Sequence, residues 1–227
     1  RGLTLRALNG AARAAGLRPG QSRADAFAIA PGLVAAMAEP ERERQALTRL
    51  AQWCERWSPA VSLDLSPEGR EGLFLDMTGA AHLFGGEAAL LAQMQTRLAR
   101  AGIACRVAVA DTAGAAWALA RYGEAARTVV PAGGAREALR DLSVAALRLD
   151  PDTLALARRL GLKRIGDLYA LPRAGLARRF READGLGLVR RLDQALGQTA
   201  EALAPVRPPA RYRAWESYAD VLTDIDG

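Results

Sequence analysis

Residue types that build many functional sites are scarce in this chain of 227 residues. It has one histidine, His82, and two cysteines, Cys54 and Cys105, which lie far apart in the sequence. These three residues lack the spacing of a zinc site, and two distant cysteines favour a reduced, cytoplasmic protein. We therefore expect no bound metal and no cofactor.

Long hydrophobic runs are also missing. No apolar run approaches the roughly 20 residues needed to cross a bilayer. The longest candidate, 107–120, is interrupted by Asp111 and Gly114. The N-terminus has no cleavable hydrophobic segment, so we expect neither secretion nor contact with a membrane. The chain begins without Met, and we expect it to be a piece of a longer protein.

Positive charge is present in excess, and nearly all of it is arginine. The formal net charge is +6, and Lys163 is the only lysine. Arginine binds phosphate through two parallel hydrogen bonds and stacks on bases, so this bias is typical of nucleic-acid binding. Half of the residues, 50%, are hydrophobic, which indicates a folded domain rather than a disordered chain.

Hydrophobic periodicity and turn residues predict the local structure up to about residue 135. Expected strands cover 2–7, 60–65, 72–78, 103–109 and 128–131, and residues 66–70 are expected to join the second and third of these as a hairpin loop. Expected helices cover 9–15, 22–29, 41–57, 87–101 and 112–122, with Asn9 and Ser22 as N-caps. From residue 60 the order is strand, strand, helix, strand, helix, strand. With one more strand upstream, that order predicts a ferredoxin-like, mainly antiparallel sheet with helices on one face.

After Ala135 the pattern changes to short helices separated by Gly, Pro and Asp. We expect a domain boundary near residues 137–143. A proline-rich stretch starts near residue 205 and is predicted to be a stiff linker. Residues 211–227 resemble the beginning of a further, incomplete domain.

Several motifs, in order along the chain, resemble those of the Y-family translesion DNA polymerases. Residues 7–17 resemble the fingers motif ANYxARxxGV, and residues 73–78 resemble the palm strand AYLDVT. Residues 160–168 resemble the thumb segment MGLRTIGDL. The stretches LDMTG at 75–79, HLFGG at 82–86 and DTAGAAWA at 111–118 are most similar to the ImuB branch of that family.

The resemblance implies an α+β fold with polymerase-like fingers, palm and thumb. The fingers would cover 1–38, with a palm strand at the start, and the palm would cover 39–137. A small helical thumb would cover 138–204, and 205–227 would hold the linker and the start of a little-finger domain.

The resemblance also implies where catalytic carboxylates should lie. Nucleotidyl transfer uses two divalent metals held by converging carboxylates. The Asp-Glu pair of the family's SxDE motif can be placed in two ways here. One alignment places it at Asp64 and Leu65, and the other at Glu71 and Gly72. Either placement lacks one carboxylate, and Asp76 lies too far along its strand to replace it.

Nucleotide contacts are depleted as well. The family's tyrosine in ANY corresponds to Gly10, and its helix-borne lysine corresponds to Ala113. Asn9 and Arg13 remain as remnants of a nucleotide site, although Asn9 also fits a helix cap and Arg13 a solvated position. We expect no catalytic residues.

Positive charge gathers in the expected thumb, where family members hold the DNA backbone without reading sequence. Solvated arginines are the alternative interpretation. The DNA-binding candidates are Arg158, Arg159, Lys163, Arg164, Arg173, Arg178, Arg179, Arg190 and Arg191. A pair of acidic residues, Asp150 and Asp152, stands at one expected phosphate-binding turn and would weaken binding.

These observations lead to one preferred function and two alternatives. The preferred one is a non-catalytic homologue that binds DNA as an adaptor in SOS-induced mutagenic translesion synthesis, in the cytoplasm at the nucleoid. The resemblance implies as partners a RecA-like protein, a replicative-type error-prone polymerase and a sliding clamp, contacted mostly through regions outside this chain. The alternatives are an active error-prone translesion polymerase and an unrelated nucleic-acid-binding module, and the order of the motifs disfavours the latter.

Overall fold

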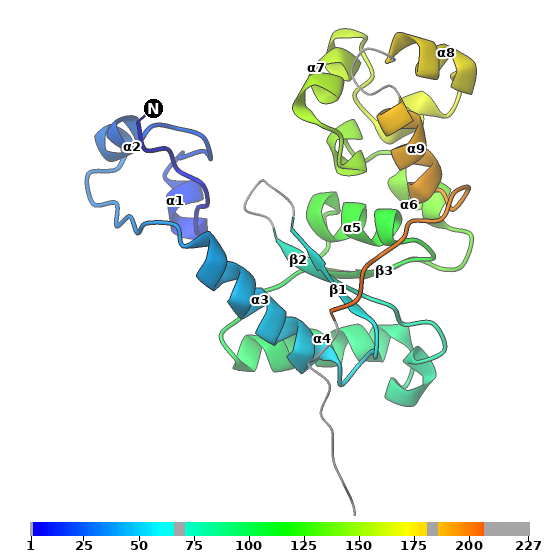
Figure 1. Ribbon diagram of the computed structural model, residues 1–227, viewed down its shortest axis with the longest axis horizontal. Helices are drawn as coiled ribbons and strands as arrows, with labels where there is room; N and C mark the ends of the chain where they lie inside the picture. The colour runs from blue at the N-terminus through cyan, green and yellow to red at the C-terminus, as the bar shows by residue number, and fades with distance from the viewer. Residues whose placement is uncertain (1, 66–70, 181–185, 207–227) are drawn as a thin grey trace, which may run out of the picture.

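The computed structural model describes residues 2–65, 71–180 and 186–206. The expected hairpin loop 66–70, most of the proline-rich stretch and the expected start of a further domain lie outside the described residues. The described chain is a mixture of helices and short strands, as the α+β class requires (Figure 1). No described helix is long and apolar enough to cross a membrane.

The N-terminal part holds two short helices and lacks the strand expected over 2–7. Helix α1 spans Gly10–Ala14 and α2 spans Arg23–Ile29, and their N-caps are Asn9 and Ser22, as predicted. Instead of a strand, Thr4 forms only an isolated bridge with Ser22. The chain before α1 therefore pairs with the turn before α2 and is not a palm strand. The long helix α3, Pro40–Cys54, connects this part to the strands.

The expected single antiparallel sheet is wrong, because the described strands form two separate pairs. Strands β1, Val61–Asp64, and β2, Gly72–Leu75, are antiparallel. Strands β3, Val107–Val109, and β4, Arg127–Val129, are parallel. A helix connects β3 to β4, and such a crossover returns the chain in the same direction. The hairpin pairing of β1 with β2 was predicted and is confirmed, whereas the parallel pairing of β3 with β4 was not predicted.

The helices also cover both faces of β3–β4, where one covered face was expected. Helix α4, Glu87–Arg100, packs in one hydrophobic cluster with α3 and with Val107 and Val109. Helix α5, Ala113–Tyr122, packs in a second cluster with Ala108 and Ala110. Since successive side chains of a strand point to opposite faces, α4 and α5 lie on opposite sides. Figure 1 shows α5 above the strands and α3 and α4 below them.

The rest of the described chain is a region of short helices stacked above α5 (Figure 1). Its residues share the α5 cluster, which continues from Ala115 to Ala195. The cluster thus extends across residues 137–143, where a domain boundary was expected, and that boundary stays a prediction. The elements are α6 (Ala135–Leu139), η2 (Val144–Leu147), α7 (Pro151–Arg159), η3 (Ile165–Leu168), α8 (Arg173–Arg179) and α9 (Leu186–Ala195), while η1 (Ala81–Phe84) precedes α4.

Helices α5 and α9 pack closely together at Gly114. A Cβ atom at this position would lie 3.0 Å from the Cα of Ala195 and 3.2 Å from its amide nitrogen. Thr112, the N-cap of α5, also donates a hydrogen bond of 2.9 Å to the carbonyl of Ala195. The missing side chain therefore sets how near the helical region can lie to the strands.

Replacing Gly114 by Ala should destabilise the protein by about 1 kcal/mol, since the cost of overpacking exceeds the gain in helix propensity. The matched control is Gly175→Ala in α8, where a Cβ would meet no atom within 4 Å. That change should stabilise by up to about 1 kcal/mol. Urea unfolding of both variants measures the difference, and shifts of equal sign would contradict the close packing.

Candidate active-site remnant and nucleic-acid interface

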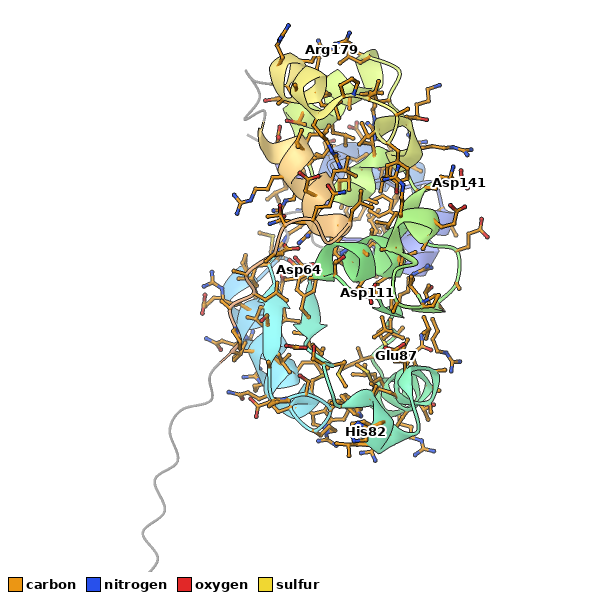
Figure 2. The ribbon with its side chains drawn as sticks, turned by 90° about the vertical axis from the view of Figure 1, so that its right-hand side faces the viewer. Asp64, His82, Glu87, Asp111, Asp141 and Arg179 are labelled. Atoms are coloured by element: carbon orange, nitrogen blue, oxygen red, sulfur yellow. The ribbon has the colours of Figure 1, made fainter. Side chains whose placement is uncertain are left out.

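Asp64, one of the two acids to which the expected Asp-Glu pair could align, already forms an ion pair with an arginine. It ends β1 next to α5 (Figure 2). Its Oδ2 accepts a hydrogen bond of 2.7 Å from the ring nitrogen of Trp117 and forms an ion pair with Nη2 of Arg121. The side chains of Asp64 and Arg121 are 12% and 17% exposed. A guanidinium thus lies against this carboxylate.

Gly72 makes room for that ion pair. It lies opposite Asp64 in the β1–β2 register. A Cβ at Gly72 would stand 3.0 Å from Nη2 of Arg121. The guanidinium of Arg121 also lies over the Trp117 ring, 4.7 Å from its centroid. Because α5 places Trp117 and Arg121 four residues apart, both side chains reach the same point of β1.

Glu71, the carboxylate of the alternative alignment, is also paired with an arginine. Nη2 of Arg6 lies 2.6 Å from its Oε1, and Nη1 of Arg6 lies 2.9 Å from Oε2 of Glu43 in α3. Arg6 therefore joins the N-terminal part to both α3 and the start of β2. In both placements of the expected Asp-Glu pair, the one acid that is present already has an arginine partner.

Asp76 does not join these acids. Its backbone amide bonds to the carbonyl of Ala60, at the other end of the hairpin from Asp64. Hydrogen bonds from Thr78 hold the pKa of the Asp76 carboxyl below its usual value. Asp76 is thus a turn residue. Within the described residues, no group of three His, Cys, Asp or Glu side chains could hold a metal ion.

The two residues expected to remain from a nucleotide site, Asn9 and Arg13, lie at the start of α1 and within it. Asn9 caps this helix, and its Oδ1 accepts a hydrogen bond of 2.8 Å from the amide of Ala12. Arg13 is exposed and has no ion-pair partner among the described residues. Ala113 opens α5 and offers only a methyl group where the family's lysine was expected. Asn9 therefore has a structural role, and a role for Arg13 in binding a nucleotide stays a prediction.

The nine basic residues expected to bind DNA divide into two groups. Three of them, Arg164, Arg173 and Arg191, pair with Asp141, Asp193 and Glu201. The others are exposed and have no ion pair within the described ranges: Arg158, Arg159, Lys163, Arg178, Arg179 and Arg190. Figure 2 shows Arg179 at the far end of the helical region from the strands. The exposed group is therefore the candidate phosphate-binding surface.

Helix ends explain part of this pattern. Arg158 and Arg159 lie in the last turn of α7, and Arg178 and Arg179 in the last turn of α8, where positive charge complements the helix dipole. At the start of α7, Asp150 caps the helix by accepting from the amide of Thr153 at 2.8 Å. Burial opposes the charge of Asp150, yet the hydrogen bonds from Thr153 keep its pKa below the usual value. This helix start already holds an anion.

A buried charge cluster that sequence reasoning missed joins the helical region to the segment after α9. Arg148 makes two hydrogen bonds to Glu201, of 2.7 and 2.6 Å, and Arg191 makes a third of 3.1 Å. Burial works against the charge of Glu201, but the two arginines hold its pKa below the usual value. Desolvation and the neighbouring Arg148 lower the pKa of Arg191. No local pattern connects Arg148 with Glu201, because the two lie 53 residues apart in the sequence.

For Arg121 and Trp117 a sequence signal did exist. Their i, i+4 spacing on a predicted helix puts both on one face, which is how an aromatic ring and a guanidinium stack. What the spacing does not show is that this face meets β1.

Comparison with known proteins agrees with the geometry. The sequence profile of the impB/mucB/samB family matches residues 3–121. Over 193 residues the chain is 53% identical to Protein ImuB from two strains of Caulobacter vibrioides. The alignment covers 85% of this chain but 40% of that protein, so the chain spans less than half of these relatives.

Solved structures share the fold. DinB from Sulfolobus solfataricus aligns with a TM-score of 0.67 at 18% identity, over 87% of this chain and 57% of that one. The insertion ternary complex of Dbh DNA polymerase aligns with a TM-score of 0.67 at 18% identity, over 86% and 56%. The resemblance to Y-family polymerases, and to their ImuB branch, is confirmed.

Removing the Arg121 guanidinium should leave the carboxylate of Asp64 half-buried and without its cation. We expect Arg121→Ala to cost about 2 kcal/mol of unfolding free energy, and the added change Asp64→Asn to restore part of it. The control is Arg164→Ala, whose pair with Asp141 is exposed and should contribute less than about 1 kcal/mol. Urea denaturation tests this; equal losses in the two single variants would refute it.

Proposed function

Because this chain belongs to the impB/mucB/samB family, we propose that it is a non-catalytic polymerase homologue that binds DNA as an adaptor in SOS-induced mutagenic translesion synthesis. We place this activity in the cytoplasm, at the nucleoid. The fold is that of Y-family polymerases, and the loss of catalysis and the adaptor role are the parts that we infer.

One observation supports the absence of catalysis. Arg121 forms an ion pair with Asp64, a carboxylate that would have to be free in order to bind a metal ion. Two-metal catalysis needs several carboxylates converging on cations about 3.5–4 Å apart. Here Asp64 is paired with Arg121, and Glu71 is paired with Arg6. A metal ion at Asp64 would have to displace a guanidinium that is also packed against Trp117.

The phosphate-binding side of the reaction is weakened in parallel. A triphosphate is held by charge-assisted hydrogen bonds, each of which contributes about 1.5–3 kcal/mol. Gly10 and Ala113 offer no side-chain donor, and Asn9 is used as a helix cap. Losses at both the metal and the phosphate positions support a binding role over a catalytic one.

The exposed basic group supports DNA as the ligand. Arg158, Arg159, Lys163, Arg178, Arg179 and Arg190 belong to three helices and a connecting turn of one region. Since none is held by an acid in the described chain, each is free to contact phosphate. Such contacts fix the position of a protein on DNA without reading base sequence.

Protein partners are inferred from the family resemblance. They are a RecA-like protein, a replicative-type error-prone polymerase and a sliding clamp. We assign these contacts mainly to parts of the protein beyond this chain.

The chain should not extend a primer in magnesium or manganese, because both the metal and the triphosphate contacts are missing. Arg121→Ala should not extend one either, since freeing Asp64 does not replace the lost phosphate donors. A Y-family polymerase with intact carboxylates serves as the positive control in the same gel assay. Template-directed extension that Asp64→Ala abolishes would establish the alternative, an active translesion polymerase.

DNA binding should be weak, in the roughly micromolar range of non-specific complexes, and equal for unrelated duplex sequences. Replacing Arg178 and Arg179 by Ala should weaken it. The log–log salt dependence should also flatten, by about 0.9 for each phosphate that the variant no longer neutralises.

The matched control replaces Arg97 and Arg100, which are also exposed in the last turn of a helix, α4. Fluorescence anisotropy across a salt series measures both variants. Equal weakening in the two would show that net charge, and not this surface, binds DNA. No binding at low salt would contradict the adaptor role.

A further inference from the structure

The segment that follows α9 crosses from the helical region back to the strands without forming a helix or strand of its own. It runs from Gly197 to Val206, and most of its residues are exposed. At its start, the amides of Gln198 and Thr199 bond to the carbonyl of Asp193, which ends α9 with a turn. Figure 1 shows this segment, in orange, running from α9 down past the strands.

Glu201 fixes the middle of this segment. Its two carboxylate oxygens accept from both terminal nitrogens of Arg148, and Oε1 also accepts from Arg191. The Glu201 and Arg148 side chains are 12% and 14% exposed. Paired two-point bonds between a guanidinium and a carboxylate are strong and geometrically specific. In contrast, the neighbours Ala200 and Ala202 are exposed.

The position of Arg148 is also fixed by its backbone conformation and by two aromatic rings. Its backbone has φ of +57°, and it is the one non-glycine residue in the described chain with a left-handed backbone. Its guanidinium lies 5.6 Å from the ring centroid of Trp117 and 5.9 Å from that of Phe74. Arg148 thus contacts α5 and β2 while it belongs to the helical region.

The far end of the segment pairs with β1. The amide of Val206 donates to the carbonyl of Val61 at 2.7 Å, and Pro205 forms an antiparallel bridge with Ser62. Val206 also packs on the hydrophobic cluster that contains α3 and α4. This short stretch of chain therefore connects the cluster around α5, which includes Ala195, to the cluster on the other face.

We propose that residues 197–206 form a strap, latched by Glu201 on Arg148 and Arg191, which holds the helical region to β1 and opens as a unit while both clusters stay folded. Segments with few buried contacts open locally at a lower free energy than the whole protein. Within the strap, only Glu201, Leu203 and Val206 are partly buried, and the other residues are exposed. This inference does not depend on DNA binding or on catalysis.

Amide hydrogen exchange, followed by NMR on the full chain, tests the latch directly. The Val206 amide reports the strap, and the Asp76 amide, which bonds to Ala60 within the hairpin, reports the sheet. In Glu201→Ala, Val206 should exchange about 10- to 100-fold faster, the range expected for losing hydrogen bonds to charged groups. Asp76 should be unchanged.

A second variant guards against general unfolding. Arg148→Gly removes the same latch but suits the left-handed backbone, so it should be tolerated while it releases Val206 to a similar degree. The control is Asp141→Ala, which removes an acid from an exposed pair with Arg164 and should leave both amides unchanged. Unaltered exchange at Val206 in both latch variants, or equal acceleration at Asp76, would overturn the proposal.

Discussion

The close packing of α5 sets the geometry of both the fold and the site. Its small residues, Gly114, Ala115 and Ala118, let the helical region approach until backbone meets backbone at Ala195. With one face of the helix held there, the side chains of Trp117 and Arg121 are directed toward β1. The ion pair with Asp64, and the contact of Arg148 with the Trp117 ring, both depend on this orientation.

The ion pair of Asp64 with Arg121 shows how the fold accommodates a carboxylate that lies largely away from water. A half-buried carboxylate needs a counter-charge, because desolvation penalises an unpaired ion. Arg121 supplies that counter-charge, and Gly72 leaves the space that the guanidinium occupies. A side chain of the same protein therefore satisfies the charge of Asp64.

Much of the local structure could be predicted from the sequence. Capping residues and hydrophobic spacing placed α1, α2, α3, α4 and α5 to within a few residues. Long-range pairing could not be predicted, because an alternating pattern defines a strand but not its neighbour. The parallel pairing of β3 with β4, and the failure of Thr4 to join a sheet, both follow from contacts distant in sequence.

The candidate site, too, could be predicted from the sequence only in part. Asp64 and Glu71 were identified as the two possible carboxylates, but their arginine partners come from α5 and from the N-terminal part. The basic residues of the sequence likewise could not be separated into Arg191, which binds Glu201, and Arg190, which has no ion pair in the described chain. The sequence shows which residues carry charge, but the fold determines which of those residues form ion pairs.

The bond between Val206 and Val61 has a consequence for the order of folding. It joins residues that lie far apart in the chain, so its loop-closure cost falls only once the intervening elements are in place. On the ribosome, the hairpin β1–β2 emerges long before residue 206 is made. The β1 edge of the hairpin therefore stays unpaired until the helical region and residue 206 have been synthesised. The time needed to translate those residues sets how long that edge is exposed.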